Sequence, residues 1–170
     1  MAEALKLDIP DELDQLAKAV LKTACDRDLR LASAESCTGG LLASLLTDIP
    51  GCSHAFERGF VVYTDEAKNE LLGVPKAILE TDGAVSEAAA RALAAGALER
   101  SRADIVAAIT GFAEAGPGPE DEAGLVHFAS GRRHRGVHHR LVRFGDIGRA
   151  RVRYGALEVA LKMMREEMEA

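Results

Sequence analysis

The segment from Asp104 to Thr110 constrains the fold more strongly than any other part of the chain. Its sequence, DIVAAIT, is a continuous apolar run with polar residues at both ends. Such a run is typical of a strand that is buried on both faces, and this burial requires helices above and below the sheet. Apolar residues at helical spacing between Pro10 and about Asp28, and an alanine-rich stretch from Ser86 to Arg100, predict helices of this kind.

Strands and helices are expected to alternate through the rest of the chain. The remaining predicted elements are strands at 29–34, 59–63, 125–130 and 137–144, and helices at 41–47, 66–72 and from about Ile147 onward. This order predicts one α/β domain over residues 1–170, a three-layer α/β/α sandwich with a mixed, mainly parallel sheet. The last helix has an apolar stripe with spacings of four and three residues, which favours docking on its own sheet over a coiled coil.

The composition is that of an ordinary globular domain, with 48% apolar residues, 28% charged residues and a net charge of −6. Charged residues interrupt every apolar stretch before it reaches the about 18 residues that a membrane helix needs. The first residues lack the basic and apolar regions of a signal peptide, so we expect a cytoplasmic protein with no membrane partner. The three cysteines form no Cys-x-x-Cys pair, which argues against a disulfide framework and a zinc ribbon.

Residues 131–153 form a basic cluster that contains eight arginines and one acidic residue. Neutralisation of phosphates by these arginines is the best argument for a nucleic-acid partner. Only 4% of the residues are aromatic and none is tryptophan, so few side chains are present to stack on bases. We therefore favour an exposed turn or a surface for homo-oligomer formation over nucleic-acid binding. The arginines can also attract an anionic small substrate.

Ser36 follows a predicted strand and precedes a predicted helix, with Gly39 and Gly40 close behind it. The free N–H groups and the positive dipole end of that helix would face the serine hydroxyl, and the glycines permit a ligand to approach the backbone closely. The segment 38–40 is therefore expected to donate hydrogen bonds to an oxyanion. The pattern indicates a nucleophile, although it lacks the Gly-x-Ser-x-Gly elbow of α/β-hydrolases and is also compatible with a simple helix cap.

Lysine is the base that this chain offers, because no His-Asp pair stands at a familiar spacing. Tyr63 ends a predicted strand and Lys68 lies about one turn into the next helix, so both are expected near Ser36 at the C-terminal edge of the sheet. Burial and a neighbouring cation such as Arg58 would lower the pKa of Lys68, and the Tyr63 hydroxyl would orient or relay the proton. The alternative interpretation is a solvated lysine on a short helix.

Three other motifs carry less weight. The loop 111–124 has the glycine spacing of a Walker loop, but Pro117 and Gly118 replace its Lys and Ser/Thr, which leaves a flexible loop suited to covering a ligand. No Gly-x-Gly-x-x-Gly follows a strand, so a dinucleotide-binding fold has no support. His134 and His138 flank a turn and match no zinc motif.

Four segments of the chain also carry a family signature. They are AESCTGG at 34–40, ERGFVVY at 57–63 with Lys68 and LLGV at 71–74, GAVS at 83–86, and AITG at 108–111. Together they closely resemble the CinA C-terminal domain family, from about residue 10 to the end of the chain. The active members of that family are nicotinamide-nucleotide amidohydrolases. The resemblance implies a stand-alone three-layer α/β/α domain that hydrolyses the carboxamide of a small nucleotide, nicotinamide mononucleotide, to nicotinate mononucleotide and ammonia in pyridine nucleotide salvage.

Carried over by position, the resemblance implies that Ser36 is the nucleophile and that Lys68 and Tyr63 activate it, with neither a metal nor an organic cofactor. In the implied mechanism the serine attacks the amide carbon, ammonia leaves, and water releases the acyl-enzyme. The residues expected to bind the substrate are Thr38, Gly39, Gly40, Arg58, Thr110 and Gly111.

The glycine loop departs from the family pattern. The family usually reads [ST]-G-I-A-G-P-x-G-G followed by K-P-V-G, whereas this chain reads TGFAEAGPGP at 110–119 and EDEAG at 120–124. Carboxylates at Glu114, Glu120, Asp121 and Glu122 would repel a substrate phosphate by about 1 kcal/mol each near the surface. The alternative hypothesis is therefore a weakly active or inactive relative that serves as a binding or regulatory protein.

Overall fold

The computed structural model describes residues 8–170, so the first residues, on which the signal-peptide expectation rests, lie outside the described range. Within this range five strands form one sheet in the order β2-β1-β3-β4-β5. They are β1 (Leu31–Glu35), β2 (Phe56–Val61), β3 (Ile105–Gly111), β4 (Leu125–Arg132) and β5 (Gly136–Arg143). β1 pairs in parallel with β2 and β3, whereas β4 pairs antiparallel with β3 and β5. The mixed sheet is confirmed, with parallel and antiparallel pairings in equal number.

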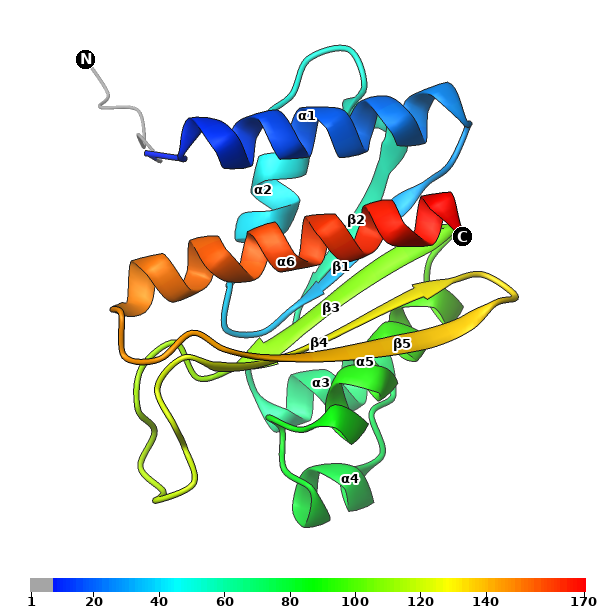
Figure 1. Ribbon diagram of the computed structural model, residues 1–170. Helices are drawn as coiled ribbons and strands as arrows, with labels where there is room; N and C mark the ends of the chain where they lie inside the picture. The colour runs from blue at the N-terminus through cyan, green and yellow to red at the C-terminus, as the bar shows by residue number, and fades with distance from the viewer. Residues whose placement is uncertain (1–7) are drawn as a thin grey trace, which may run out of the picture.

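Helices cover both faces of the sheet (Figure 1). One layer holds α1 (Asp11–Asp26), α2 (Leu41–Thr47) and α6 (Arg149–Glu169), and the other holds α3 (Asp65–Leu72), α4 (Lys76–Thr81) and α5 (Glu87–Glu99). This arrangement confirms the three-layer α/β/α sandwich. α6 lies against β3, β4 and α1, so it docks on its own sheet as its apolar stripe predicts.

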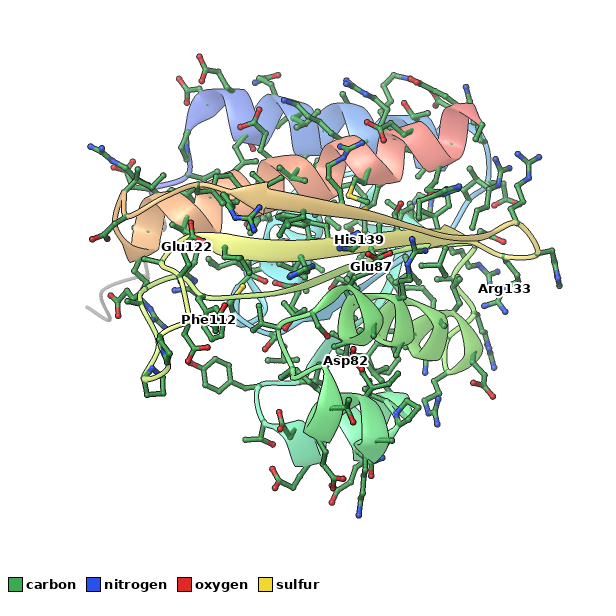
Figure 2. The ribbon with its side chains drawn as sticks, turned by 60° about the horizontal axis from the view of Figure 1, so that its bottom comes forward. Asp82, Glu87, Phe112, Glu122, Arg133 and His139 are labelled. Carbon is green, nitrogen blue, oxygen red and sulfur yellow. The ribbon has the colours of Figure 1, made fainter. Side chains whose placement is uncertain are left out.

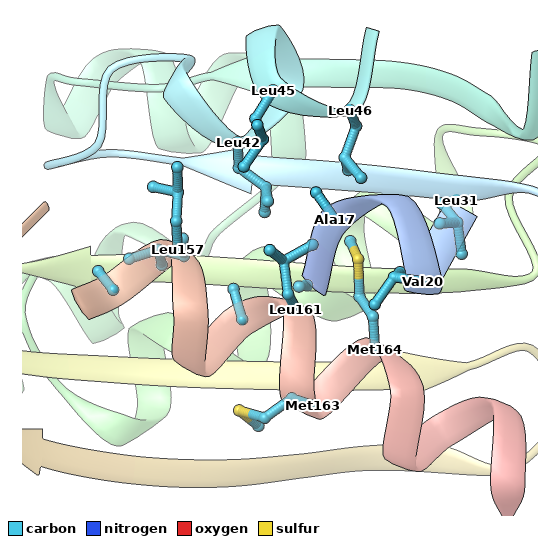
Figure 3. Packing of buried hydrophobic residues seen from close by; sticks show 14 of the residues in the cluster. Ala17, Val20, Leu31, Leu42, Leu45, Leu46, Leu157, Leu161, Met163 and Met164 are labelled. Atoms are coloured by element: carbon cyan, nitrogen blue, oxygen red, sulfur yellow. The ribbon is translucent and has the colours of Figure 1, made fainter. Parts of the chain in front are cut away.

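Each face of the sheet has its own apolar core. The core under α1, α2 and α6 is built mainly from leucines and methionines (Figure 3), among them Leu42, Leu46, Leu157, Leu161 and Met164. The core under α5 is built largely from small residues, among them Ala32, Ala34, Ala90, Ala94 and Ala108. Small side chains bring α5 close to the sheet, because little bulk separates the two backbones.

β3 contributes to both cores. Ile105 and Ile109 pack into the leucine-rich core, and Val106 packs into the alanine-rich core on the opposite face. Side chains along a strand alternate between its two faces, so a strand with apolar residues at every position must be covered on both sides. The continuous apolar run of the sequence has this origin.

Two elements differ from the sequence-based expectation. The sequence does not predict α4, because this helix has only six residues, too few to show a helical spacing of apolar positions, and none of them is fully buried. β2 begins at Phe56, before the predicted strand, and most of its residues are partly or fully exposed because it is an edge strand. No helix of residues 8–170 is long and apolar enough to span a lipid bilayer.

Candidate active site

A cavity of about 340 Å³ opens at the edge of the sheet where the parallel strands end. Ser36 follows β1, Tyr63 follows β2, Thr110 and Gly111 end β3, and Lys68 reaches the cavity from α3. The other lining residues are Cys37, Asp65, Ala84, Val85, Phe112, Ala113, Glu114, Ala115 and Arg149. The structure therefore brings the three predicted catalytic residues to one cavity.

The carboxylate of Glu35 shapes the turn after β1. Glu35 is fully buried and accepts hydrogen bonds from the hydroxyls of Ser33 at 3.1 Å and Thr38 at 2.7 Å. It also accepts from the N–H groups of Leu42 at 3.0 Å and Ala43 at 2.9 Å, in the first turn of α2. A buried carboxylate requires donors around it, and the dipole of the helix favours an anion at this end. Hydrogen-bond donors from β1, from the turn and from α2 thus hold Glu35, the residue directly before the serine.

Ser36 begins this turn. Its N–H donates to the carbonyl oxygen of Ile109 in β3 at 3.0 Å, and its own carbonyl accepts from the N–H of Gly39 at 3.0 Å. Gly39 and Gly40 have φ angles of +59° and +94°, which a residue with a side chain rarely adopts. Ser36 is only 7% exposed, and it faces the cavity.

Thr38, Gly39 and Gly40, which the sequence predicts to bind the substrate, are not among the residues that line the cavity. Thr38 is fully buried; its hydroxyl donates to Glu35, and its carbonyl accepts from Arg153 Nη2 at 2.9 Å. The first-turn N–H groups of α2 that point at Glu35 are already engaged. The hydroxyl and carbonyl of Thr38 and the backbone angles of the two glycines therefore shape the serine turn.

Lys68 is buried and unpaired. The residue is 2% exposed, and no carboxylate within residues 8–170 forms an ion pair with it. Burial is the main cause that lowers the pKa of Lys68 from its ordinary value of 10.5, while the charge of Asp65 acts in the opposite direction. Its Nζ donates a hydrogen bond to the backbone carbonyl of Tyr63 at 3.2 Å. An amine with a lowered pKa, facing a serine across a cavity, is suited to act as a base.

Tyr63 contacts Lys68 through its backbone and not through its hydroxyl. Its side chain is exposed at the mouth of the cavity, with the whole residue 64% exposed. Among the described residues no hydrogen bond engages the Tyr63 hydroxyl, so the structure provides no partner for the expected proton relay. The residue holds the base by its carbonyl oxygen.

Arg58 is not among the residues that line the cavity and has no part in the pKa shift of Lys68, so the expectation that it lowers this pKa is wrong. Its guanidinium pairs with Glu57 at 2.7 Å and donates to the carbonyl of Arg100 at 3.1 Å. Arg58 stands five positions before Tyr63, which corresponds to about 16 Å along an extended chain. The physical cause of the lowered Lys68 pKa is burial and not a neighbouring cation.

Thr110 and Gly111 form the floor of the cavity at the end of β3, in agreement with their predicted place. The Thr110 hydroxyl donates to the carbonyl of Ala84 at 2.7 Å, which ties β3 to the segment before α5. A Cβ added at Gly111 would lie 2.7 Å from the carbonyl oxygen of Leu125, so a larger residue would push β4 away. Both residues fix the shape of the cavity.

The first part of loop 111–124, residues 111–115, lines the cavity at its rim, and Figure 2 labels Phe112 and Glu122 near the two ends of the loop. Arg149, the first residue of α6, approaches the loop from the other layer, with its Nη1 3.5 Å from Glu114 Oε2. The two side chains are 47% and 63% exposed. Arg149 therefore places a guanidinium at the rim, and the site residues predicted from the sequence do not include it.

The other carboxylates of the loop are partly compensated. Asp121 accepts from the N–H of Gly118 at 2.9 Å, and Glu122 lies 3.5 Å from Arg143. Since these carboxylates have local partners, the repulsion of a phosphate is weaker than the sequence alone predicts.

Much of the basic cluster 131–153 is also engaged within the protein. Arg133 donates to three carbonyls between Leu98 and Ala103, and Arg140 pairs with Glu166 at 2.9 Å. These contacts leave fewer guanidinium groups free to bind phosphates.

Glu35 and Cys37 carry no predicted role, and Arg149 is predicted only as one of the arginines of the basic cluster 131–153 that can attract an anionic substrate. A signal exists for Glu35, because a carboxylate inside a strand that is otherwise apolar must find buried donors. Cys37 lines the cavity, but burial raises the pKa of its thiol to about 11, so it remains protonated near neutral pH. Across the described ranges, no group of three or more His, Cys, Asp or Glu side chains is arranged to hold a metal ion.

Comparisons with known proteins agree with this fold. The competence/damage inducible protein CihA from Agrobacterium tumefaciens superposes with a TM-score of 0.90 at 42% identity, covering 98% of this chain and 100% of that chain. The competence damage-inducible protein A (ComA) from Klebsiella pneumoniae superposes with a TM-score of 0.84 at 35% identity, covering 92% and 97% of the two chains.

Curated relatives match over a shorter region. The CinA-like protein of Akkermansia muciniphila is 52% identical over 115 residues, which are 67% of this chain and 28% of that protein. The putative competence-damage inducible protein of Symbiobacterium thermophilum is 50% identical over 117 residues, 68% of this chain and 28% of that protein. The matched part thus spans little more than a quarter of the length of these relatives.

The fold and the site define a three-layer α/β/α domain with a serine and a buried lysine at one cavity on the edge of its sheet. The family model for the CinA C-terminal domain matches residues 13–168. The chain belongs to the CinA C-terminal domain family, which confirms the resemblance noted in the sequence.

Proposed function

We propose that this protein hydrolyses the carboxamide of nicotinamide mononucleotide, with Ser36 as nucleophile and Lys68 as base. The observation that carries this proposal is the burial of an unpaired lysine at the cavity that also holds the serine. Burial lowers the pKa of the amine and so raises the fraction that is neutral and able to take a proton. The cavity volume of about 340 Å³ falls within the range of about 300–1,000 Å³ that is usual for small-molecule sites.

In the first step Lys68 Nζ takes the proton of the Ser36 hydroxyl while Oγ attacks the amide carbon. The carbonyl oxygen of the amide becomes an oxyanion. The N–H groups of Cys37 and Thr38 donate to no backbone carbonyl within residues 8–170, and we assign them as its donors. This assignment replaces the N–H groups of the first turn of α2, which Glu35 occupies.

In the second step the tetrahedral intermediate breaks its C–N bond. Lys68 returns its proton to the leaving nitrogen, ammonia departs, and the nicotinoyl group remains as an ester on Ser36. A water molecule then attacks this ester while Lys68 again accepts a proton. Breakdown of the second intermediate returns that proton to Ser36 Oγ and releases nicotinate mononucleotide.

Ammonia release from nicotinamide mononucleotide tests the proposal. We expect turnover by the parent protein and a loss of at least about a thousandfold in kcat for S36A. The matched control is S44A, which removes an exposed hydroxyl from α2. An S36A protein that folds and turns over like the parent contradicts the serine mechanism.

The same assay separates the alternative, a relative that binds ligands without turnover. That alternative was motivated by the acidic loop, yet Glu114, Asp121 and Glu122 all contact partners inside the protein. Ligand binding by the parent protein with no ammonia release would favour it.

A further inference from the structure

The mouth of the cavity holds a pair of opposite charges. Arg149 from α6 and Glu114 from loop 111–124 both line the cavity and face each other at 3.5 Å. Within the described part of the chain, Arg149 is the only arginine among the lining residues. The other lining cation, Lys68, is buried and held by a backbone carbonyl. The cavity thus separates a buried amine, placed for chemistry, from an exposed guanidinium at its mouth.

The contact between Arg149 and Glu114 is weak by its geometry. Its 3.5 Å separation exceeds the about 2.7–2.9 Å of a charge-assisted hydrogen bond. Both side chains are largely exposed, and exposed ion pairs contribute little to stability. A ligand anion that offers two oxygens to the guanidinium can therefore replace the carboxylate.

Glu114 can leave Arg149 without a rearrangement of the loop. At the base of the loop, the N–H of Phe112 donates to the carbonyl of Leu125 at 2.9 Å. Nearer the tip, the N–H of Gly116 donates to the carbonyl of Asp121 at 2.9 Å. Glu114 lies between these two fixed points, so rotation of its side chain is enough to free the guanidinium.

We infer that Arg149 binds the phosphate of the ligand and that the Glu114 carboxylate competes with this phosphate for the guanidinium. The planar fork of arginine matches two phosphate oxygens and stays charged at any working pH. Glu114 weakens binding in two ways, because it must be displaced and because it then stands beside a phosphate of like charge. The inference rests on the proposed function only for the identity of the nucleotide.

Calorimetric titration with nicotinamide mononucleotide, in the 170-residue protein carrying S36A to prevent turnover, tests the inference. We expect E114Q to tighten binding about three- to tenfold and R149Q to weaken it at least about tenfold. Most of the gain from E114Q should vanish when R149Q is also present, because no guanidinium is left to release. The control E80Q changes an exposed carboxylate of α4 that does not line the cavity and should leave the dissociation constant unchanged.

Nicotinamide riboside, which lacks the phosphate, is the second probe, and its affinity should not depend on Arg149. An R149Q protein that binds the mononucleotide like its parent overturns the phosphate site. An E114Q protein with unchanged or weaker affinity overturns the competition, as does the absence of binding of both the mononucleotide and inorganic phosphate. If the expected binding pattern appears while the parent protein releases no ammonia, the inference holds and the proposed function is wrong. If the parent protein releases ammonia but its affinity for the mononucleotide changes with neither Arg149 nor Glu114, the proposed function holds and the inference is wrong.

Discussion

The backbone carbonyl of Tyr63 accepts a hydrogen bond from Lys68 Nζ at 3.2 Å. A carbonyl oxygen can only accept, so it uses a hydrogen of the amine and leaves the lone pair of a neutral lysine free to point elsewhere. The carbonyl therefore orients the base without neutralising it, as a carboxylate in the same place would. Asp65 lines the cavity but forms no ion pair with Lys68.

The first prediction concerns the pH dependence of catalysis. The neutral form of Lys68 is the active form, so kcat/KM should rise with pH through the pKa of Lys68, which burial sets below 10.5. K68R should lose at least about a thousandfold in kcat/KM, because a guanidinium does not deprotonate at working pH. The control is K76R at the start of the exposed α4. A pH profile of the parent enzyme that is flat up to the ordinary lysine pKa would contradict the role of Lys68 as base.

The second prediction concerns the Glu35 turn. E35Q replaces a carboxylate that accepts four hydrogen bonds by an amide whose NH₂ group meets donors, so buried groups lose their partners. We expect a loss of about 3 kcal/mol in the free energy of unfolding, measured by urea denaturation. E66Q, at an exposed position of α3, is the control and should change stability by less than about 0.5 kcal/mol. Equal stability of the two variants would show that the carboxylate is not needed for the turn.

The third prediction concerns the contact between α5 and α3. A Cβ at Gly96 would lie 2.0 Å from the carbonyl oxygen of Leu72, so G96A must force the two helices apart. We expect a loss of about 1–3 kcal/mol in unfolding free energy, although alanine favours helix formation by about 1 kcal/mol over glycine. At the exposed neighbour Ala95 the preference should follow helix propensity, with A95G less stable than the parent. A G96A protein more stable than the parent would rule out the close approach.

The fourth prediction concerns a histidine pair between the sheet and α5. His127 Nδ1 and His139 Nε2 lie 2.9 Å apart, and His139 faces Glu87 at 3.5 Å; Figure 2 labels the latter two side by side. Burial lowers the pKa of both histidines from the ordinary 6.5, and the charge of His139 lowers that of His127 further.

The unfolded chain therefore takes up protons near pH 6.5 while the folded protein does not, so stability should fall as the pH drops from about 7.5 to about 5.5. Urea unfolding over this range should show a smaller decrease for H127Q than for the parent. H134Q, at an exposed turn, should keep the parent slope. A parent protein whose stability rises on acidification in this range contradicts the assignment.

Much of the fold follows from the sequence because buried elements carry periodic apolar residues. β3 and α5 are covered on the faces that their sequences mark as apolar, and both were predicted. α4 has no such mark because none of its residues is fully buried. Half of the strand pairings are antiparallel, because the hairpin of β4 and β5 joins the sheet with β4 antiparallel to β3. The sequence predicts the hairpin but does not show which strand it joins.

The site was only partly predictable. Ser36 and Lys68 each follow a strand that ends at the same edge, so local order along the chain places both. Arg58 was placed at the cavity on the basis of its charge, but charge does not show how far a residue lies from the end of its strand. The pairing of Glu114 with Arg149 joins residues 35 positions apart in different layers, and no local pattern specifies such a contact.

The carboxylate of Glu35 draws all its donors from residues 33–43, and the hydroxyl of Ser36 is none of them. The hydroxyl of Ser36 therefore takes no part in the hydrogen bonds by which Glu35 holds the turn. The variants S36C and S36A should therefore keep the same backbone conformation in this turn. A protein engineer can therefore replace the reactive group at position 36, or stop the reaction before it is complete, without changing the fold.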